Sequence, residues 1–169
     1  MMRNAHGAGK CPWPRPNSVR PERERHQPIP FAEQQMRQRP QLTLQDAQVL
    51  AAAARECAKK QGLEGTIAIV DFGGHLLYLE RPDLQSPNSV EVAIQKAQTA
   101  AFRERPSSAL EQRVKEKPGW LKFPNGLPMS GGVPLFYEKQ CVGGIAVSGI
   151  AEQDEVAAQA GADAIKTLR

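Results

Sequence analysis

The spacing of apolar residues along the chain changes from steps of three and four to continuous short runs, which predicts where helices and strands lie. After Thr43, small apolar residues recur at alternating steps of three and four, the period of an amphipathic helix that ends near Gly62. Thr43-Leu-Gln-Asp46 resembles a capping box and predicts that the helix begins at that threonine. Because most of the stripe is alanine, we expect close packing against a sheet or a second helix.

Two short apolar runs, Ile67–Val70 and Leu76–Leu79, follow this helix and predict a β-hairpin. The Gly73-Gly74 pair between them supplies the positive φ angles that a tight reversal needs. His75 leaves the turn at the head of the second run and is the only histidine after residue 26. Asp71 lies four residues before it, so we expect a hydrogen bond between the two side chains. That bond serves the turn, or it prepares the imidazole for proton transfer.

A second amphipathic pattern runs from about Ser89 to Arg103 and predicts another alanine-faced helix. Lys96 and Thr99 fall on a different face of this helix, together with Arg103. Two interpretations remain open. The strip is a solvated helix surface, or it is a ligand-facing strip that offers a cation and a hydroxyl group.

The remaining patterns predict a short helix, a long loop, a second hairpin and a last helix. The helix runs from Pro106 to Lys115, and the loop covers residues 118–132, with Trp120 and Phe123 placed to cover a pocket or a subunit contact. The second hairpin pairs residues 133–137 with residues 142–147. Glycines inside its last strand indicate a bulge or a close backbone approach. Residues 152–168 form the predicted final helix.

The predicted order is therefore α-β-β-α-α-β-β-α. Both strand pairs are hairpins, so we expect an antiparallel sheet flanked by helices, an α+β domain over residues 41–169. A doubly wound parallel sheet is excluded because its strands would need helical crossovers.

Residues 1–40 form a separate Pro/Arg-rich tail with seven prolines and no periodic apolar pattern. We expect this tail to be disordered. It is either a basic binding arm or the product of an over-long gene start, in which case translation begins at Met36. The tail carries a net charge of +5, whereas the whole chain carries +4. Residues 41–169 therefore carry a net charge of −1. A near-neutral domain argues against nucleic acid as a partner.

No apolar stretch reaches the ~20 residues that a membrane span requires, and the N-terminus lacks the apolar core of a secretory signal. We therefore expect a cytoplasmic protein. The three cysteines, at positions 11, 57 and 141, show neither disulfide nor zinc spacing. Cys57 lies beside the stripe of the first helix. It is either a buried small apolar residue or a thiolate ligand.

The chain has no phosphate-binding loop, nucleophile elbow or zinc-protease motif. With one histidine in the domain, it offers few partners for acid–base catalysis. From its residues alone, it is a small-ligand binding domain or an assembly subunit.

Six segments in order together resemble the GlcG/HbpS family, also called the haem-degrading or DUF336 family, which includes the C-terminal domain of PduO-type adenosyltransferases. The resemblance covers residues 42 to 168. The segments are Leu42-Thr-Leu-Gln-Asp-Ala47, Ile69-Val-Asp-Phe-Gly-Gly-His-Leu-Leu77, Ala93-Ile-Gln-Lys-Ala-Gln-Thr-Ala-Ala101, Gly131-Gly-Val-Pro-Leu135, Val142-Gly-Gly-Ile-Ala-Val-Ser-Gly149 and Asp154-Glu-Val-Ala-Ala-Gln-Ala-Gly161.

The resemblance implies a profilin-like fold, self-association into a dimer or larger homo-oligomer, and the binding of haem or a related tetrapyrrole that some members of the family show. Lys96 and Thr99 match a segment on a helix implicated in haem contact. In some relatives a histidine on the first helix is the axial ligand, near the position of Cys57 here, and a cysteine thiolate can also bind haem iron.

Three hypotheses follow, and whether the chain is an enzyme stays open. In the first, it binds haem through Cys57, Lys96, Thr99 or His75, with a role in haem degradation or iron handling. In the second, it acts on a small organic acid of glycolate or propanediol metabolism, whose carboxylate is held by Lys96 or Arg103 while His75 carries the proton. In the third, it is an oligomeric scaffold without catalysis.

Overall fold

The computed structural model describes residues 38–168, so the predicted tail falls almost wholly outside the described residues. Short 3₁₀ helices precede or follow the longer helices: η2 (Pro118–Lys122), η3 (Ala151–Gln153) and η4 (Ala164–Thr167). The main elements confirm the predicted order. They are α1 (Leu44–Lys59), β1 (Thr66–Asp71), β2 (Leu76–Glu80), α2 (Asn88–Arg103), α3 (Ser108–Glu116), β3 (Gly132–Tyr137), β4 (Gln140–Ser148) and α4 (Asp154–Asp163).

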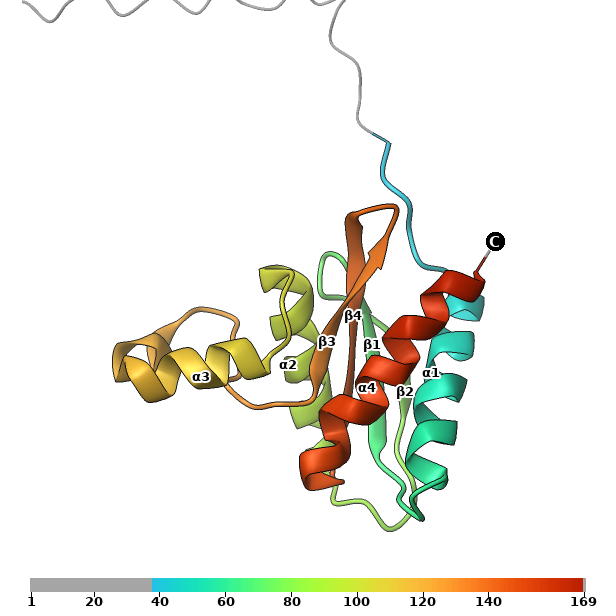
Figure 1. The fold of residues 1–169 in the computed structure, drawn as a ribbon, viewed down its shortest axis with the longest axis horizontal. Coiled ribbons are helices and arrows are strands. Elements are labelled where there is room, and N and C mark those ends of the chain that lie inside the picture. Colours follow the sequence, from blue (N-terminus) through green and yellow to red (C-terminus); the bar gives the residue numbers. More distant parts are fainter. Residues whose placement is uncertain (1–37, 169) are drawn as a thin grey trace, which may run out of the picture. The chain divides into compact units, whose positions relative to one another are not determined.

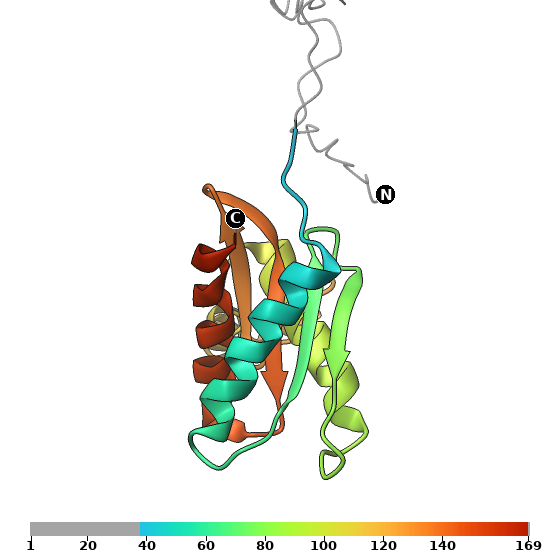
Figure 2. The same ribbon diagram turned by 90° about the vertical axis from the view of Figure 1, so that its right-hand side faces the viewer.

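The four strands form one antiparallel sheet in the order β2-β1-β4-β3. The two predicted hairpins therefore join through their inner strands, and Ile69 of β1 lies opposite Ile145 of β4. Helix α2 covers one face of the sheet, while α1 and α4 lie side by side on the other (Figures 1 and 2). This arrangement confirms the predicted α+β class.

The larger core lies between the sheet and the α1/α4 layer. Branched side chains of the strands, such as Ile67 and Ile145, meet the alanine stripes of the two helices. Alanine has no side chain beyond Cβ, so the helices approach the strands closely and exclude water from the contact. The capping box predicted at Thr43 is present, since its hydroxyl accepts the amide of Asp46 and the Asp46 carboxylate accepts the amide of Thr43.

Gly144 is a point of close contact between α2 and the sheet. A Cβ built on this residue would lie 2.3 Å from the carbonyl oxygen of Ala97. The β3–β4 register also shifts between Leu135 and Phe136. Both the close approach and the bulge predicted for this strand are therefore confirmed.

The final helix is shorter than predicted, because only Asp154–Asp163 is α-helical and 3₁₀ turns flank it. The Asp154 carboxylate accepts the amide of Ile150 at 2.9 Å, which closes a tight turn just before the helix. The predicted long loop contains η2, which starts at Pro118, the residue best suited to a first helical position. None of the described helices has the length and apolar character needed to cross a membrane.

Candidate functional site

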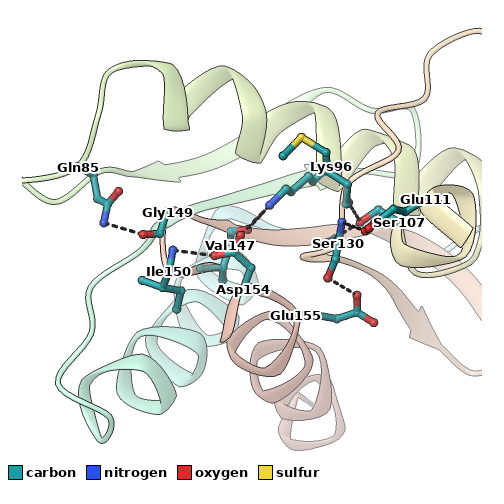
Figure 3. Close-up of polar contacts among 12 residues, drawn as sticks. Gln85, Lys96, Ser107, Glu111, Ser130, Val147, Gly149, Ile150, Asp154 and Glu155 are labelled. Atoms are coloured by element: carbon teal, nitrogen blue, oxygen red, sulfur yellow. Dashed lines mark hydrogen bonds and ion pairs between the residues drawn. The ribbon is translucent and has the colours of Figure 1, made fainter. Parts of the chain in front are cut away.

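Lys96 is buried rather than solvated, with 2 % of its surface exposed. Its ammonium group lies 2.7 Å from the Asp154 carboxylate and 3.4 Å from the carbonyl oxygen of Val147 (Figure 3). The interpretation of this strip as a solvated helix surface is therefore wrong. A buried charge is tolerated when it is paired, and here the pair ties α2 to the start of α4 and the end of β4.

Thr99 is also buried, and its hydroxyl is occupied on both sides. It donates to the Gln95 carbonyl oxygen at 2.7 Å and accepts the Leu127 amide at 2.8 Å. The segment after η2 is thereby held against α2. Ser130 attaches the same segment to α4, because its hydroxyl donates to the Glu155 carboxylate at 3.0 Å (Figure 3). Lys96 and Thr99 thus both have partners within the protein, and that of Thr99 fixes the loop.

His75 lies at the hairpin turn with its side chain 82 % exposed. The predicted contact with Asp71 is present: the His75 amide donates to one carboxylate oxygen at 2.9 Å, and Nδ1 lies 3.2 Å from the other. Gly74, at φ +80°, makes this reversal possible. Burial raises the pKa of Asp71, but the hydrogen bonds from His75 outweigh it, so this pKa lies below its ordinary value.

The Asp71 carboxylate is an acceptor, so Nδ1 of His75 carries the proton in this arrangement. The lone pair of Nε2 then has no donor partner among residues 38–168, and the side chain is exposed. A carboxylate that orients an imidazole in this way is the usual second partner of a metal-binding histidine. The pair can therefore present Nε2 to a metal.

Four large apolar side chains are exposed near this turn: Phe72, Leu76, Leu79 and Phe102. We call these four residues and His75 the His75 surface. Leu76 lies opposite Val70, which packs on α2, so the leucine faces the same side of the sheet. The end of α2 lies next to the turn (Figure 1), where Gln98 donates to the Gly74 carbonyl oxygen at 3.0 Å. Because α2 packs on β1, β3 and β4, the edge strand β2 is left uncovered on this face.

Cys57 lies apart from these residues. It is half-buried on α1, on the face of the sheet opposite to α2, and toward the end of α1 that leads into β1 (Figure 2). His75 follows the other end of β1. Within one chain, Cys57 therefore cannot share a site with Lys96, Thr99 or His75.

A cavity of about 430 Å³ opens beside the C-terminal part of α1. Arg55 is bound there by the Glu80 carboxylate through two hydrogen bonds, and the Tyr78 hydroxyl donates to the same carboxylate at 2.6 Å. The Arg55 hydrogen bond is the main cause that lowers the pKa of Glu80, against burial, which raises it. The central charges of this cavity are thus already paired.

Asp154 and the apolar part of the His75 surface were not identified from the sequence. The signal for Asp154 was indirect: a lysine on an alanine-rich helix needs a carboxylate if that part of the helix is covered. Nothing in the local pattern showed which acid provides it. The sequence did not show that Phe72 and Phe102 are exposed either, because large aromatic side chains are more often buried.

Comparisons with known proteins agree with this fold. Residues 42–163 match the family described as haem degrading protein HbpS-like. Protein GlcG of Escherichia coli (strain K12) is 34 % identical over 108 residues, which are 63 % of this chain and 81 % of GlcG.

Two solved structures extend the comparison. The structure of HbpS has 37 % identity and a TM-score of 0.70, covering 76 % of this chain and 92 % of HbpS. A PduOC:heme complex has 27 % identity and a TM-score of 0.66, covering 74 % of this chain and 95 % of PduOC.

Proposed function

The chain belongs to the HbpS-like family of haem degrading proteins, and from this membership we propose that it binds haem at the His75 surface. The observation that carries the proposal is the Asp71–His75 pair at the centre of exposed apolar side chains. The likeness to a PduOC:heme complex supports it, because that relative holds the same type of ligand on a similar fold.

The residues at this surface fit the three requirements of haem. Iron needs an axial ligand, and Nε2 of His75 is free for that purpose. The porphyrin needs an apolar, preferably aromatic, contact, which Phe72 and Phe102 offer. Its carboxylates need a cation, and Arg39 lies 4.2 Å from the centre of the Phe72 ring at the rim of this surface.

Haem, when bound, supplies an iron centre for redox and ligand chemistry. The chain's part is to hold and orient the group: Asp71 keeps the imidazole in one tautomer, and the apolar residues exclude water from one side. Haem degradation, which the family description names, is the finer part of the proposal. It is checked by loss of the haem absorption band in the presence of a reductant and oxygen.

The cofactor roles predicted for Lys96 and Thr99, and the metal role predicted for Cys57, remain proposals of lower rank. Both side chains are bound within the protein, so we expect Lys96 to act by joining α2 to α4 and Thr99 by fixing the loop after η2. Self-association also stays a prediction. A second copy that covers the His75 surface would shield bound haem, and light scattering with and without haemin tests this.

The test is a haemin titration of the full chain, followed by the Soret band. We expect a shifted Soret band with the wild type. The affinity for haemin should be lower by a factor of about ten or more in His75→Gln. Asp71→Asn should weaken binding by a smaller factor, because the imidazole stays but loses its orienting carboxylate. Cys57→Ser is the matched control and should bind like the wild type. Equal haemin affinity in His75→Gln and the wild type would refute the assignment of the site.

A further inference from the structure

Two arginines and two aromatic rings meet where α3 and η2 stand out beyond α2 (Figure 1), and we call them the arginine–aromatic cluster. The guanidinium of Arg103 lies 5.3 Å from the centre of the Phe123 ring, and that of Arg113 lies 5.0 Å from the Trp120 ring. The two rings stack on each other with their centres 5.4 Å apart. Three separate elements, α2, α3 and η2 with the residue after it, thus converge on one place.

The positive charge of this cluster is not compensated by the part of the chain that the structure describes. None of the ion pairs among the described residues involves Arg103, Arg105 or Arg113. Two carboxylates lie on the same helix as Arg113. Glu111 is bound by Lys115 and by the amide of Ser130, and Glu116 accepts a hydrogen bond from Gln112 at 3.2 Å. The two arginines of the cluster therefore have no ion-pair partner among residues 38–168.

One donor of Arg103 is left over as well. Its Nη1 is buried and has no hydrogen-bond partner among the described residues. Burial lowers the pKa of Arg103, and the charges of Arg113 and Arg105 lower it further. A buried guanidinium N–H without an acceptor is destabilising. The guanidinium group of Arg103 therefore has unused hydrogen-bonding capacity.

The aromatic rings contact the two guanidinium groups but cannot accept the hydrogen bonds of their N–H donors at the edge. A guanidinium stacks on a ring through its face, while its N–H donors point outward in the plane. Those donors match the two oxygens of a carboxylate or phosphate. Arg113 is exposed, and Arg103, Trp120 and Phe123 are half-buried, so a ligand can approach from solvent.

We propose that the arginine–aromatic cluster binds an oxoanion, a carboxylate or phosphate group, through Arg103 and Arg113, with Trp120 and Phe123 as the apolar contact for the rest of the ligand. The cluster shares no residue with the His75 surface, and small anions test it in the absence of haem. The oxoanion has two possible sources, a free small acid or phosphate, and the propionate of a bound tetrapyrrole.

The stacked position of Trp120 provides the readout. The chain has two tryptophans, so Trp13→Phe in the full chain leaves Trp120 as the reporter. We expect succinate or inorganic phosphate to change its fluorescence with a saturable dose response, compared with sodium chloride at equal ionic strength. In this background, Arg113→Gln removes an exposed cation, and Arg103→Lys keeps the charge but removes the planar fork. Arg81→Gln is the control, because Arg81 is an exposed arginine on the segment after β2.

The outcomes separate the two sources. Binding of succinate or phosphate that is weakened about tenfold or more by Arg113→Gln and Arg103→Lys, but unchanged by Arg81→Gln, supports a free oxoanion. If the small anions do not bind, haemin and haemin dimethyl ester are compared. If Arg113→Gln weakens the binding of haemin but not that of haemin dimethyl ester, a propionate is the oxoanion. If neither the small anions nor haemin distinguish Arg113→Gln from Arg81→Gln, the proposal is overturned.

Discussion

Replacing Lys96 tests how much the buried ion pair with Asp154 contributes to the stability of the domain. The side chains of the two residues are 3 % and 7 % exposed, and their charged atoms lie 2.7 Å apart. In Lys96→Met, the methionine fills most of the lysine's volume, while the Asp154 carboxylate stays buried with only the Ile150 amide as partner. Removing one partner of a buried pair costs about 3–5 kcal/mol, a large part of the 5–15 kcal/mol that typically stabilises a domain.

A double-mutant cycle separates this effect from simple loss of packing. Asp154→Asn leaves the Lys96 ammonium with neutral oxygen acceptors and no compensating charge, so it should also be strongly destabilising. The double variant contains no buried charge, and we expect it to be more stable than the sum of the single changes by about 2 kcal/mol or more. Equilibrium urea unfolding, followed by circular dichroism, gives the three free energies of unfolding.

An exposed pair in the same protein provides the control. Lys166 lies 3.1 Å from Asp163, with side chains 77 % and 56 % exposed. Lys166→Met should change the free energy of unfolding by no more than about 0.5 kcal/mol, because exposed pairs contribute little. The reasoning would be refuted if Lys96→Met cost less than about 1 kcal/mol, or if the two changes at the buried pair were additive.

Three further changes test other parts of the fold. Thr43→Ala removes the cap of α1 and should cost about 1 kcal/mol in urea unfolding; a loss below about 0.3 kcal/mol would contradict the capping role. Gly144→Ala places a Cβ 2.3 Å from the Ala97 carbonyl oxygen, so overpacking should cost about 1–3 kcal/mol, and an unchanged urea midpoint would show that α2 can move. The pKa of Glu80 is lowered by Arg55, so its stabilising contribution is present above its unfolded pKa and is lost as pH falls through the folded value. Glu80→Gln should therefore flatten the decline in stability below about pH 4.5, and a pH profile identical to that of the wild type would count against this pair.

The sequence by itself was sufficient for everything that depends on neighbouring residues. The Ile67–Val70 and Leu76–Leu79 runs with glycines between them form the β1–β2 hairpin, because side-chain period and turn chemistry act within about ten residues. The cap at Thr43 and the Asp71–His75 contact were predicted for the same reason. The element order followed, and with it the α+β class.

Only the tertiary structure decided what the polar residues of α2 do. Lys96 meets Asp154 across 58 positions in the chain, and Arg103 meets Phe123 across a segment that contains α3 and η2. Helical spacing placed Lys96 and Thr99 on one strip, but it could not show whether the strip is covered. Burial of that strip depends on where the segment after η2 is held, and this is settled by long-range hydrogen bonds such as that from Leu127 to Thr99.

The same reason explains why Cys57 was grouped with residues that it does not approach. A sequence gives the order of helices but not the side of the sheet on which each one packs, since both faces of a four-stranded sheet are apolar here. The packing of α1 beside α4, and of α2 alone on the other face, is decided by which alanine stripe fits which set of strand side chains. That choice leaves β2 uncovered and exposes the apolar side chains around His75, which no local pattern of residues reveals.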